Sequence, residues 1–189
     1  PENAPTLLVV GLDGGRVQTR EVDPETESRW KEDKVATITS YVPGTPSNPP
    51  QALVTTHLAT MEGAEAFGRL ARVEAERRGL AKARTVIALG DAGNWIDPVV
   101  GREFGQATRI VDYYHATQHL HVSGKALFGE SAKAAKWAEE MSGHLYAGRV
   151  DRVIQTLRRE AARLGAPQPQ DSPDHPRRVL SRDVGLSLI

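Results

Sequence analysis

The stretch "VVGLDGGRVQTRE", from Val9 to Glu21, decides how the chain is expected to fold. An almost continuous apolar run from Thr6 to Leu12 is typical of a central strand that is covered on both faces. Asp13 ends this run, and Gly14-Gly15 then predicts a tight reversal into a more exposed strand over Arg16 to Val22. A carboxylate at the end of a buried strand needs a physical reason, because aspartate is rarely buried without a partner.

Length and composition indicate one ordinary domain with an appendage. A chain of 189 residues can bury roughly 70% of the surface of its unfolded state. No apolar run approaches the ~20 residues that cross a bilayer, and Pro1 to Pro5 does not resemble a secretory signal. We therefore expect a cytoplasmic protein with no membrane partner.

The charged residues and the lack of cysteine limit the possible chemistry. Because there is no cysteine, any metal ion must be held by oxygen or imidazole ligands. Lysine plus arginine and aspartate plus glutamate both number 24, so the net charge does not indicate a polyanionic partner. Nucleic-acid binding must therefore be argued from individual sites.

The middle of the chain alternates between strand and helix patterns. Lys34 to Val42 alternates and is rich in β-branched residues, which predicts a third strand, followed by a proline-rich loop over Pro43 to Gln51. Apolar residues at helical spacing predict a helix from Glu62 to Arg78 that Gly79 stops. Thr85 to Leu89 is a second buried run, expected to lie parallel to the first strand. A helix from about Asp97 to Phe104 and a short apolar run complete a βββ-α-β-α-β-α order.

The last third of the chain is expected to be helical. Ala126 to Leu164 has helical periodicity throughout and predicts a helical hairpin. Ala166 to Pro176 has the composition of a flexible linker.

Three aspartates, Asp13, Asp91 and Asp112, each follow an apolar run. The carboxyl ends of neighbouring parallel strands meet at one edge of a sheet, so these side chains are expected to converge. Carboxylates close together repel one another unless a cation lies between them, and oxygen ligands favour Mg²⁺ or Mn²⁺. That is the arrangement of a two-metal phosphoryl-transfer site. An aspartate beside glycine after a strand is also a common turn residue, and this alternative stays open.

The stretch "DYYHATQHLH" places Asp112, His115 and His119 at helical positions i, i+3 and i+7. They could bind Zn²⁺. We favour the alternative that the histidines cap a helix, hydrogen-bond a carboxylate or approach a phosphate. Trp95, just beyond Asp91, could stack on a base, but we favour packing in the core.

Five segments together resemble a known family: "GLDGGRVQTRE", "RWKEDKVA", "VIALGDAGNWI", "RIVDYYHATQHL" and "HPRRVLSRDVG". In this order they are similar to the DDE transposases of the bacterial ISKra insertion-sequence group, related to the Mutator-like families. The resemblance runs from Leu7 to about Gly185. It implies an α/β, ribonuclease H-like mixed sheet in the order βββαβαβα with an all-helical insertion at the C-terminal side.

The resemblance also implies a domain division and site residues. Residues 1–125 would form an incomplete catalytic core, 126–165 the helical insertion and 166–189 a flexible tail. Asp13 and Asp91 would be the catalytic acids that hold Mg²⁺ or Mn²⁺. Asp112, His115, His119 and Trp95 would support the site or contact DNA.

The family's third acid, a glutamate after a "GSG" turn, would come after the closing "LSLI". We therefore expect a truncated catalytic-domain fragment with little or no transposition. Its partners would be the DNA of transposon ends and, by association, a second copy or an intact transposase.

Two other functions remain open. "GLDGGRVQTR" also resembles the first phosphate loop of actin-like superfamily sugar kinases, in which an aspartate and glycines turn between two strands around ATP phosphates. The chain could alternatively be a non-enzymatic association module.

Overall fold

The computed structural model describes residues 7–24, 26–42, 44–91 and 93–185. Pro1 to Thr6, Pro43 and the closing "LSLI", which belong to the predictions above, lie outside these ranges. The chain forms two compact units, residues 1–110 and 111–189, and each is described by itself. Among the described residues, no helix has both the length and the apolar character to cross a membrane.

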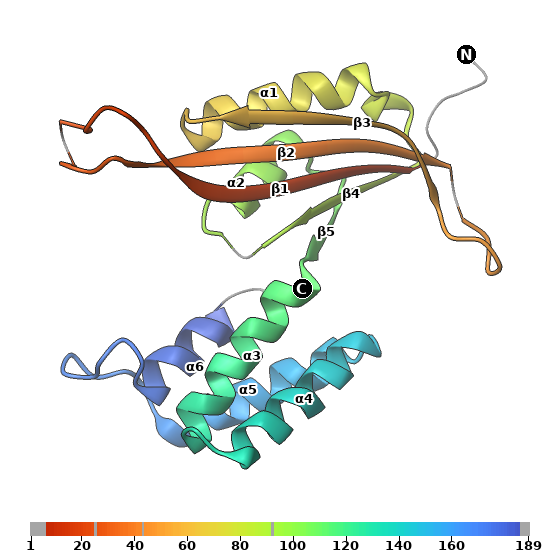
Figure 1. The fold of residues 1–189 in the computed structure, drawn as a ribbon. Coiled ribbons are helices and arrows are strands. Elements are labelled where there is room, and N and C mark those ends of the chain that lie inside the picture. Colours follow the sequence, from red (N-terminus) through yellow and green to blue (C-terminus); the bar gives the residue numbers. More distant parts are fainter. Residues whose placement is uncertain (1–6, 25, 43, 92, 186–189) are drawn as a thin grey trace. The chain divides into compact units, whose positions relative to one another are not determined.

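The first unit is built on a five-stranded mixed sheet in the order β3-β2-β1-β4-β5 (Figure 1). β1 pairs antiparallel with β2, β2 pairs antiparallel with β3, and β4 is parallel to β1. This order is consistent with a ribonuclease H-like fold. The elements are β1 (Leu7–Gln18), β2 (Trp30–Val42), β3 (Gln51–Thr60), α1 (Ala64–Arg77), η1 (Leu80–Lys82), β4 (Thr85–Gly90), α2 (Ile96–Glu103) and β5 (Thr108–Val111).

The predicted reversal at Gly14-Gly15 is wrong, because β1 continues through both glycines. They pair in regular antiparallel register with Lys34 and Asp33 of β2. Glycine permits a reversal but does not require one, and the pairing with β2 satisfies the backbone of this segment as far as Gln18. The chain turns after Gln18, where Asp23 accepts hydrogen bonds from the backbone of Thr26 and Glu27.

β3 was not predicted from the sequence, so the strand predicted as the third is in fact the second. β3 lies at the edge of the sheet; its residues 51–55 are all exposed, and residues 56–60 alternate between partly buried and exposed. Such a strand lacks the strong apolar alternation from which strands are recognised. The predicted βββ order therefore holds, but with a different assignment of segments.

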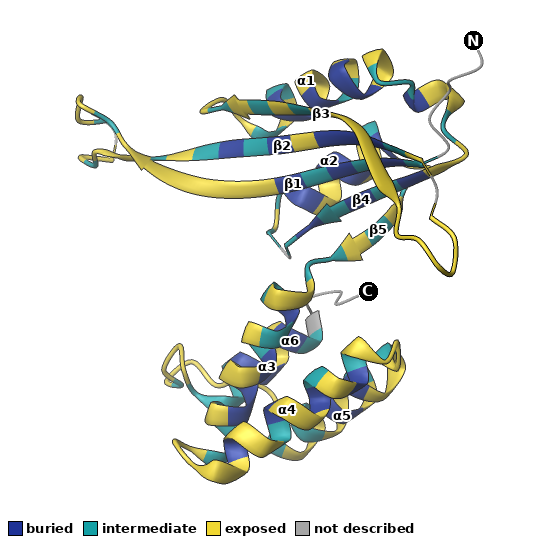
Figure 2. Ribbon diagram, turned by 45° about the vertical axis from the view of Figure 1, so that its right-hand side comes forward, coloured by how far each residue is buried: buried dark blue, intermediate teal, exposed yellow. Residues whose placement is uncertain are grey.

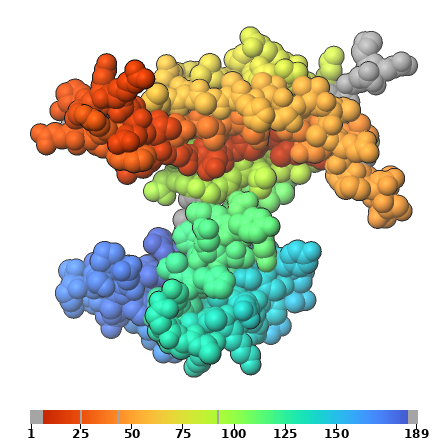
Figure 3. Space-filling view, in the orientation of Figure 1, coloured from red at the N-terminus to blue at the C-terminus, as the bar shows by residue number. Residues whose placement is uncertain are grey.

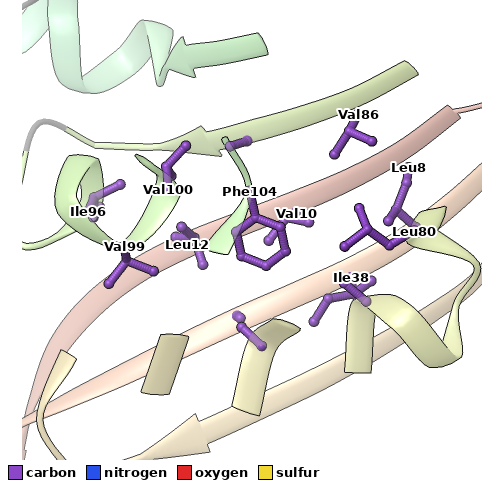
Figure 4. Packing of buried hydrophobic residues seen from close by; sticks show 14 of the residues in the cluster. Leu8, Val10, Leu12, Ile38, Leu80, Val86, Ile96, Val99, Val100 and Phe104 are labelled. Atoms are coloured by element: carbon purple, nitrogen blue, oxygen red, sulfur yellow. The ribbon is translucent and has the colours of Figure 1, made fainter. Parts of the chain in front are cut away.

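The core of this unit lies between the sheet and the helices α1 and α2 (Figure 4). Leu8, Val10 and Leu12 alternate along β1 and are buried, while the residues between them are only partly buried (Figure 2). α1 packs Phe67 and other apolar residues against them. The predicted stop of this helix is confirmed, since Gly79 has a left-handed φ of 91°.

β1 and β2 continue beyond the end of β4 as a two-stranded arm. The pairing of β1 with β4 ends at Leu12 and Gly90, whereas its pairing with β2 continues to Gln18 and Trp30. The β1 residues of this arm, 13–18, are all exposed. Figure 3 shows the arm projecting from the sheet.

The second unit is helical. Its helices are α3 (Tyr113–Phe128), α4 (Ala132–Tyr146), α5 (Val150–Leu164) and α6 (Pro176–Gly185). The continuous helical stretch predicted from Ala126 is interrupted at Gly129 and Gly148, whose φ angles of 67° and 70° are left-handed. The tail that we predicted to be flexible contains α6, because Leu180 is fully buried in the core of this unit.

We expect Phe67→Ala to destabilise the first unit strongly. The Phe67 side chain is fully buried, and its ring meets that of Trp95 edge-on at 5.4 Å between centroids. Removing it should cost about 3–5 kcal/mol of unfolding free energy. Urea denaturation followed by circular dichroism measures this loss. Leu70→Ala is the control, because Leu70 lies on the same helix but is 48% exposed, and equal losses in the two variants would contradict this packing.

Candidate functional site

Asp13 lies on β1 just after the last residue that pairs with β4, and Asp91 directly follows β4. The last pair in the register of β1 and β4 is Leu12 with Gly90, and the two aspartates are the next residues on each chain segment. Because side chains alternate along a strand, Asp13 lies on the face opposite to the buried Leu12. Asp112 belongs to the second unit, and its predicted convergence with this pair stays a prediction.

Each of the two carboxylates accepts one hydrogen bond from a nearby backbone amide. Asp13 Oδ1 accepts from the N–H of Gly14 at 2.8 Å, and Asp91 Oδ1 accepts from the N–H of Gly93 at 2.8 Å. This is the local bonding typical of aspartates in turns and strand ends. No hydrogen bond or ion pair joins the Oδ2 atom of either aspartate to another of the described residues.

Neither aspartate forms an ion pair with a lysine or arginine of the described residues. The nearby Lys34 is buried, with its Nζ 3.3 Å from Glu32 and 5.6 Å from the centre of the Trp95 ring. Two carboxylates at neighbouring positions repel each other when both are ionised. Their oxygens suit a hard divalent cation such as Mg²⁺ or Mn²⁺.

These two acids supply only part of a coordination shell. In the described ranges, no group of three or more histidine, aspartate and glutamate side chains is arranged to hold a metal ion. Mg²⁺ commonly keeps several water ligands and binds through one or two carboxylates. An ion held by these two acids alone would therefore be largely hydrated.

Arg109 holds the backbone at the end of β4. Its guanidinium donates to the carbonyl oxygens of Gly90, at 3.1 Å, and of Asp91. Its Nε also pairs with Asp97 Oδ1 at 2.9 Å. This role of Arg109 was not predicted from the sequence. The sequence signal for it is a charged residue within the apolar run "TRIV". In the structure only 15% of the Arg109 side chain is exposed.

Gly90 and Gly93 leave room that the site requires. A Cβ atom added at Gly90 would lie 2.7 Å from the carbonyl oxygen of Leu12, on the neighbouring strand. One added at Gly93 would lie 2.9 Å from Asp91 Oδ1. Both distances are shorter than van der Waals contact. A larger residue at Gly90 would push on the backbone of β1, which carries Asp13, whereas one at Gly93 would displace only the end of the Asp91 side chain.

Trp95 packs against the core, as the favoured interpretation expected. It is partly buried, contacts Phe67 edge-on, and lies 3.5 Å from the position of a Cβ atom added at Gly14. A contact between Trp95 and DNA stays a prediction.

In the second unit, His119 bonds a carboxylate, as the favoured alternative expected, whereas the cap of α3 is Asp112 and not a histidine. Asp112 Oδ1 accepts from the backbone N–H of His115 at 2.8 Å. His119 Nδ1 lies 3.0 Å from Asp183 Oδ1, and its Nε2 lies 3.1 Å from the Nε2 of His115. The two histidines are therefore linked to each other and to α6.

Asp183, which the sequence analysis did not single out, is the anchor of this cluster. It is 1% exposed, and its Oδ2 accepts a 2.6 Å hydrogen bond from Ser123 while Arg182 Nε lies 3.1 Å from its Oδ1. Burial alone would raise the pKa of Asp183, but the hydrogen bonds from His119, Ser123 and Arg182 together outweigh it and lower that pKa below its ordinary value. The side chain is therefore a carboxylate at neutral pH.

Comparison with known protein families finds no match, and no curated protein matches the sequence. Among solved structures, the chain is similar to one described as the Drosophila P element transposase strand transfer complex. The likeness has a TM-score of 0.34 and 12% sequence identity, and it covers 62% of this chain and 29% of that chain. It is too weak to carry an argument about function.

We expect Gly90→Ala to destabilise the first unit and to disturb the aspartate pair. The added methyl group would meet backbone of β1, which cannot yield as a side chain can. The cost should be about 1–3 kcal/mol of unfolding free energy. Gly101→Ala, in α2, is the matched control because a Cβ atom there meets no atom within 4 Å. In urea denaturation the control should lose nothing, and a Gly90→Ala protein as stable as the wild type would contradict the close approach of the strands.

Asp183→Asn should destabilise the second unit at neutral pH by about 1–3 kcal/mol, because the charged acceptor of three hydrogen bonds is lost. The pKa of Asp183 is lowered on folding, so its stabilising effect is present above its ordinary pKa and is lost as pH falls through the lower folded-state value. The difference in unfolding free energy between the variant and the wild type should therefore become smaller below about pH 4.

Urea denaturation in EDTA, at pH 7 and at several points below pH 4, tests this dependence. The exposed Asp174 supplies the control Asp174→Asn, whose unfolding free energy should equal that of the wild type at every pH. If the difference in unfolding free energy between Asp183→Asn and the wild type stays constant as the pH is lowered, the lost charge is not its cause.

Proposed function

We propose that the first unit is the metal-binding part of a DNA strand-cleavage and strand-transfer site, with Asp13 and Asp91 sharing one Mg²⁺ or Mn²⁺ ion. The observation that carries this proposal is the parallel register of β1 and β4, in which the two aspartates follow the paired residues Leu12 and Gly90. The resemblance of five segments to DDE transposases gives the same two residues.

At such a site the carboxylates and Arg109 would have different roles. Asp13 and Asp91 supply the negative charge that attracts the cation, and backbone amides hold one oxygen of each. Arg109 positions the backbone of Asp91. A divalent cation bound there would neutralise charge on a phosphodiester and lower the pKa of an attacking water or 3′-hydroxyl.

The reaction class that fits these groups is in-line displacement at phosphorus. It needs no covalent enzyme intermediate, so it requires neither a cysteine nor an activated serine. DNA is the proposed substrate, and transposon ends are its proposed form. Supporting or DNA-contacting roles for Asp112, His115, His119 and Trp95 belong to the same proposal and rest on the resemblance alone.

We do not propose kinase activity. The first phosphate loop of the actin-like kinases is a turn between two strands, whereas Gly14 and Gly15 are paired residues inside β1. The loop on which that alternative depended is therefore not formed.

Asp13→Asn and Asp91→Asn should each weaken Mn²⁺ binding at least about tenfold, because each removes one of two charged ligands. The free-ion signal of Mn²⁺ in electron paramagnetic resonance measures the affinity. Glu62→Gln is the control, since Glu62 is an exposed acid of the same unit. Affinities equal to that of the wild type in both aspartate variants would refute the shared site.

The same four proteins can be incubated with supercoiled plasmid and Mn²⁺ to test the chemistry. In keeping with the little transposition expected above, we expect only slow nicking by the wild type and the control, and at least about a tenfold further loss in each aspartate variant. If Mn²⁺ binds but the wild type does not nick, the catalytic part of the proposal is wrong while the metal-binding part stands.

A further inference from the structure

We propose that His115 and His119 form a second metal site, which binds a divalent transition-metal ion such as Zn²⁺ or Cu²⁺ through the two Nε2 atoms. This site lies entirely within the second unit. It does not depend on the function proposed for Asp13 and Asp91.

The distance between the two imidazole nitrogens carries the proposal. The histidines are four residues apart on α3 and so lie on the same face of the helix. Their Nε2 atoms are 3.1 Å apart, and the ring planes meet at 65°. Two ligands of a tetrahedral Zn²⁺ ion with bonds of about 2.0–2.1 Å are about 3.3 Å apart. An ion could therefore bridge the pair after a shift of a few tenths of an ångström.

The buried Asp183 orients His119 for this role. Its ionised carboxylate can only accept a hydrogen bond, so the Nδ1 of His119 carries the proton. The lone pair of a neutral His119 is then on Nε2, which faces His115. Metal-binding histidines commonly donate their other N–H to a carboxylate in this way.

Ser123 and Arg182 hold that carboxylate from two other directions. Ser123 donates to Oδ2 at 2.6 Å, and Arg182 Nε lies 3.1 Å from Oδ1. Asp183 itself is 1% exposed, so its position is fixed by the packing of α6 against α3. The orientation of His119 is therefore built into the fold before any ion binds.

Without metal, a single proton lies between the two Nε2 atoms, which otherwise would present two lone pairs to each other. A bound cation would displace that proton, which would move through solvent to the Nδ1 of His115 and leave the Nε2 lone pair for the ion. Among the described residues no third ligand completes the site, so water would fill the remaining positions. The site is open, with 17% of the His119 side chain exposed.

The ligand type separates this site from the aspartate pair. Imidazole nitrogen suits Zn²⁺, Cu²⁺ and Ni²⁺, whereas carboxylate oxygen suits Mg²⁺ and Mn²⁺. Asp13→Asn should therefore weaken Mn²⁺ binding while it leaves Zn²⁺ binding by the two histidines unchanged. Failure of one site can in this way be distinguished from failure of the other.

Isothermal titration of the full chain with Zn²⁺ tests the proposal. We expect one ion per chain, and at least a tenfold weaker affinity in His115→Ala. This variant leaves the hydrogen bonds of Asp183 intact, because the bond of the His115 ring within the described cluster is to His119 and not to Asp183. His121→Ala is the matched control, an exposed histidine on the same helix that should bind Zn²⁺ as the wild type does.

Asp183→Asn tests the orienting role, and we expect a loss of about 10–100-fold with both ligands still present. Imidazole ¹⁵N resonances report the site directly, since Zn²⁺ should shift the Nε2 signals of His115 and His119 and not that of His121. Equal Zn²⁺ affinity in the wild type and His115→Ala, or shifts confined to other histidines, would overturn the proposal.

Discussion

The parallel pairing of β1 with β4 is the constraint on which the first unit depends. Its register buries Leu8, Val10 and Leu12 under α1 and α2 and leaves Asp13 on the other face. A slip of one residue would exchange these faces, so the core and the acidic pair are fixed by the same hydrogen bonds. Gly90 makes the close pairing possible beside Leu12, because the two strands leave no room for a side chain there.

Much of this unit could be predicted because its signals are local. The apolar run into Asp13, the helix stopped by Gly79 and the run Thr85 to Leu89 all correspond to elements of the structure. The strand β3 could not, since an exposed edge strand needs little apolar periodicity. The reversal at Gly14-Gly15 was wrongly predicted for a related reason. The conformational freedom of glycine can be recognised in a sequence, but the pairing with β2 that keeps these residues in a strand cannot.

The candidate sites show the same division. Asp13, Asp91 and Asp112 were predicted from their places after apolar runs, and His115 and His119 from helical spacing. Arg109 and Asp183 were not found, because their roles depend on partners distant in the sequence. Arg109 holds backbone oxygens 18 and 19 residues away, and Asp183 meets His119 and Ser123 across 64 and 60 residues. No spacing rule relates positions so far apart, and only the folded chain brings them together.

The position of α6 has a consequence for biosynthesis. Leu180 completes the core of the second unit, and Asp183 supplies the acceptor for Ser123 and His119, yet both leave the ribosome after α3, α4 and α5. A nascent chain that has emerged only as far as Leu164 would expose apolar side chains until α6 followed. The Ser123 hydroxyl would meanwhile lack its acceptor, Asp183. Translation pauses within these residues would prolong that interval, and chaperones that bind exposed apolar segments would have their longest opportunity there.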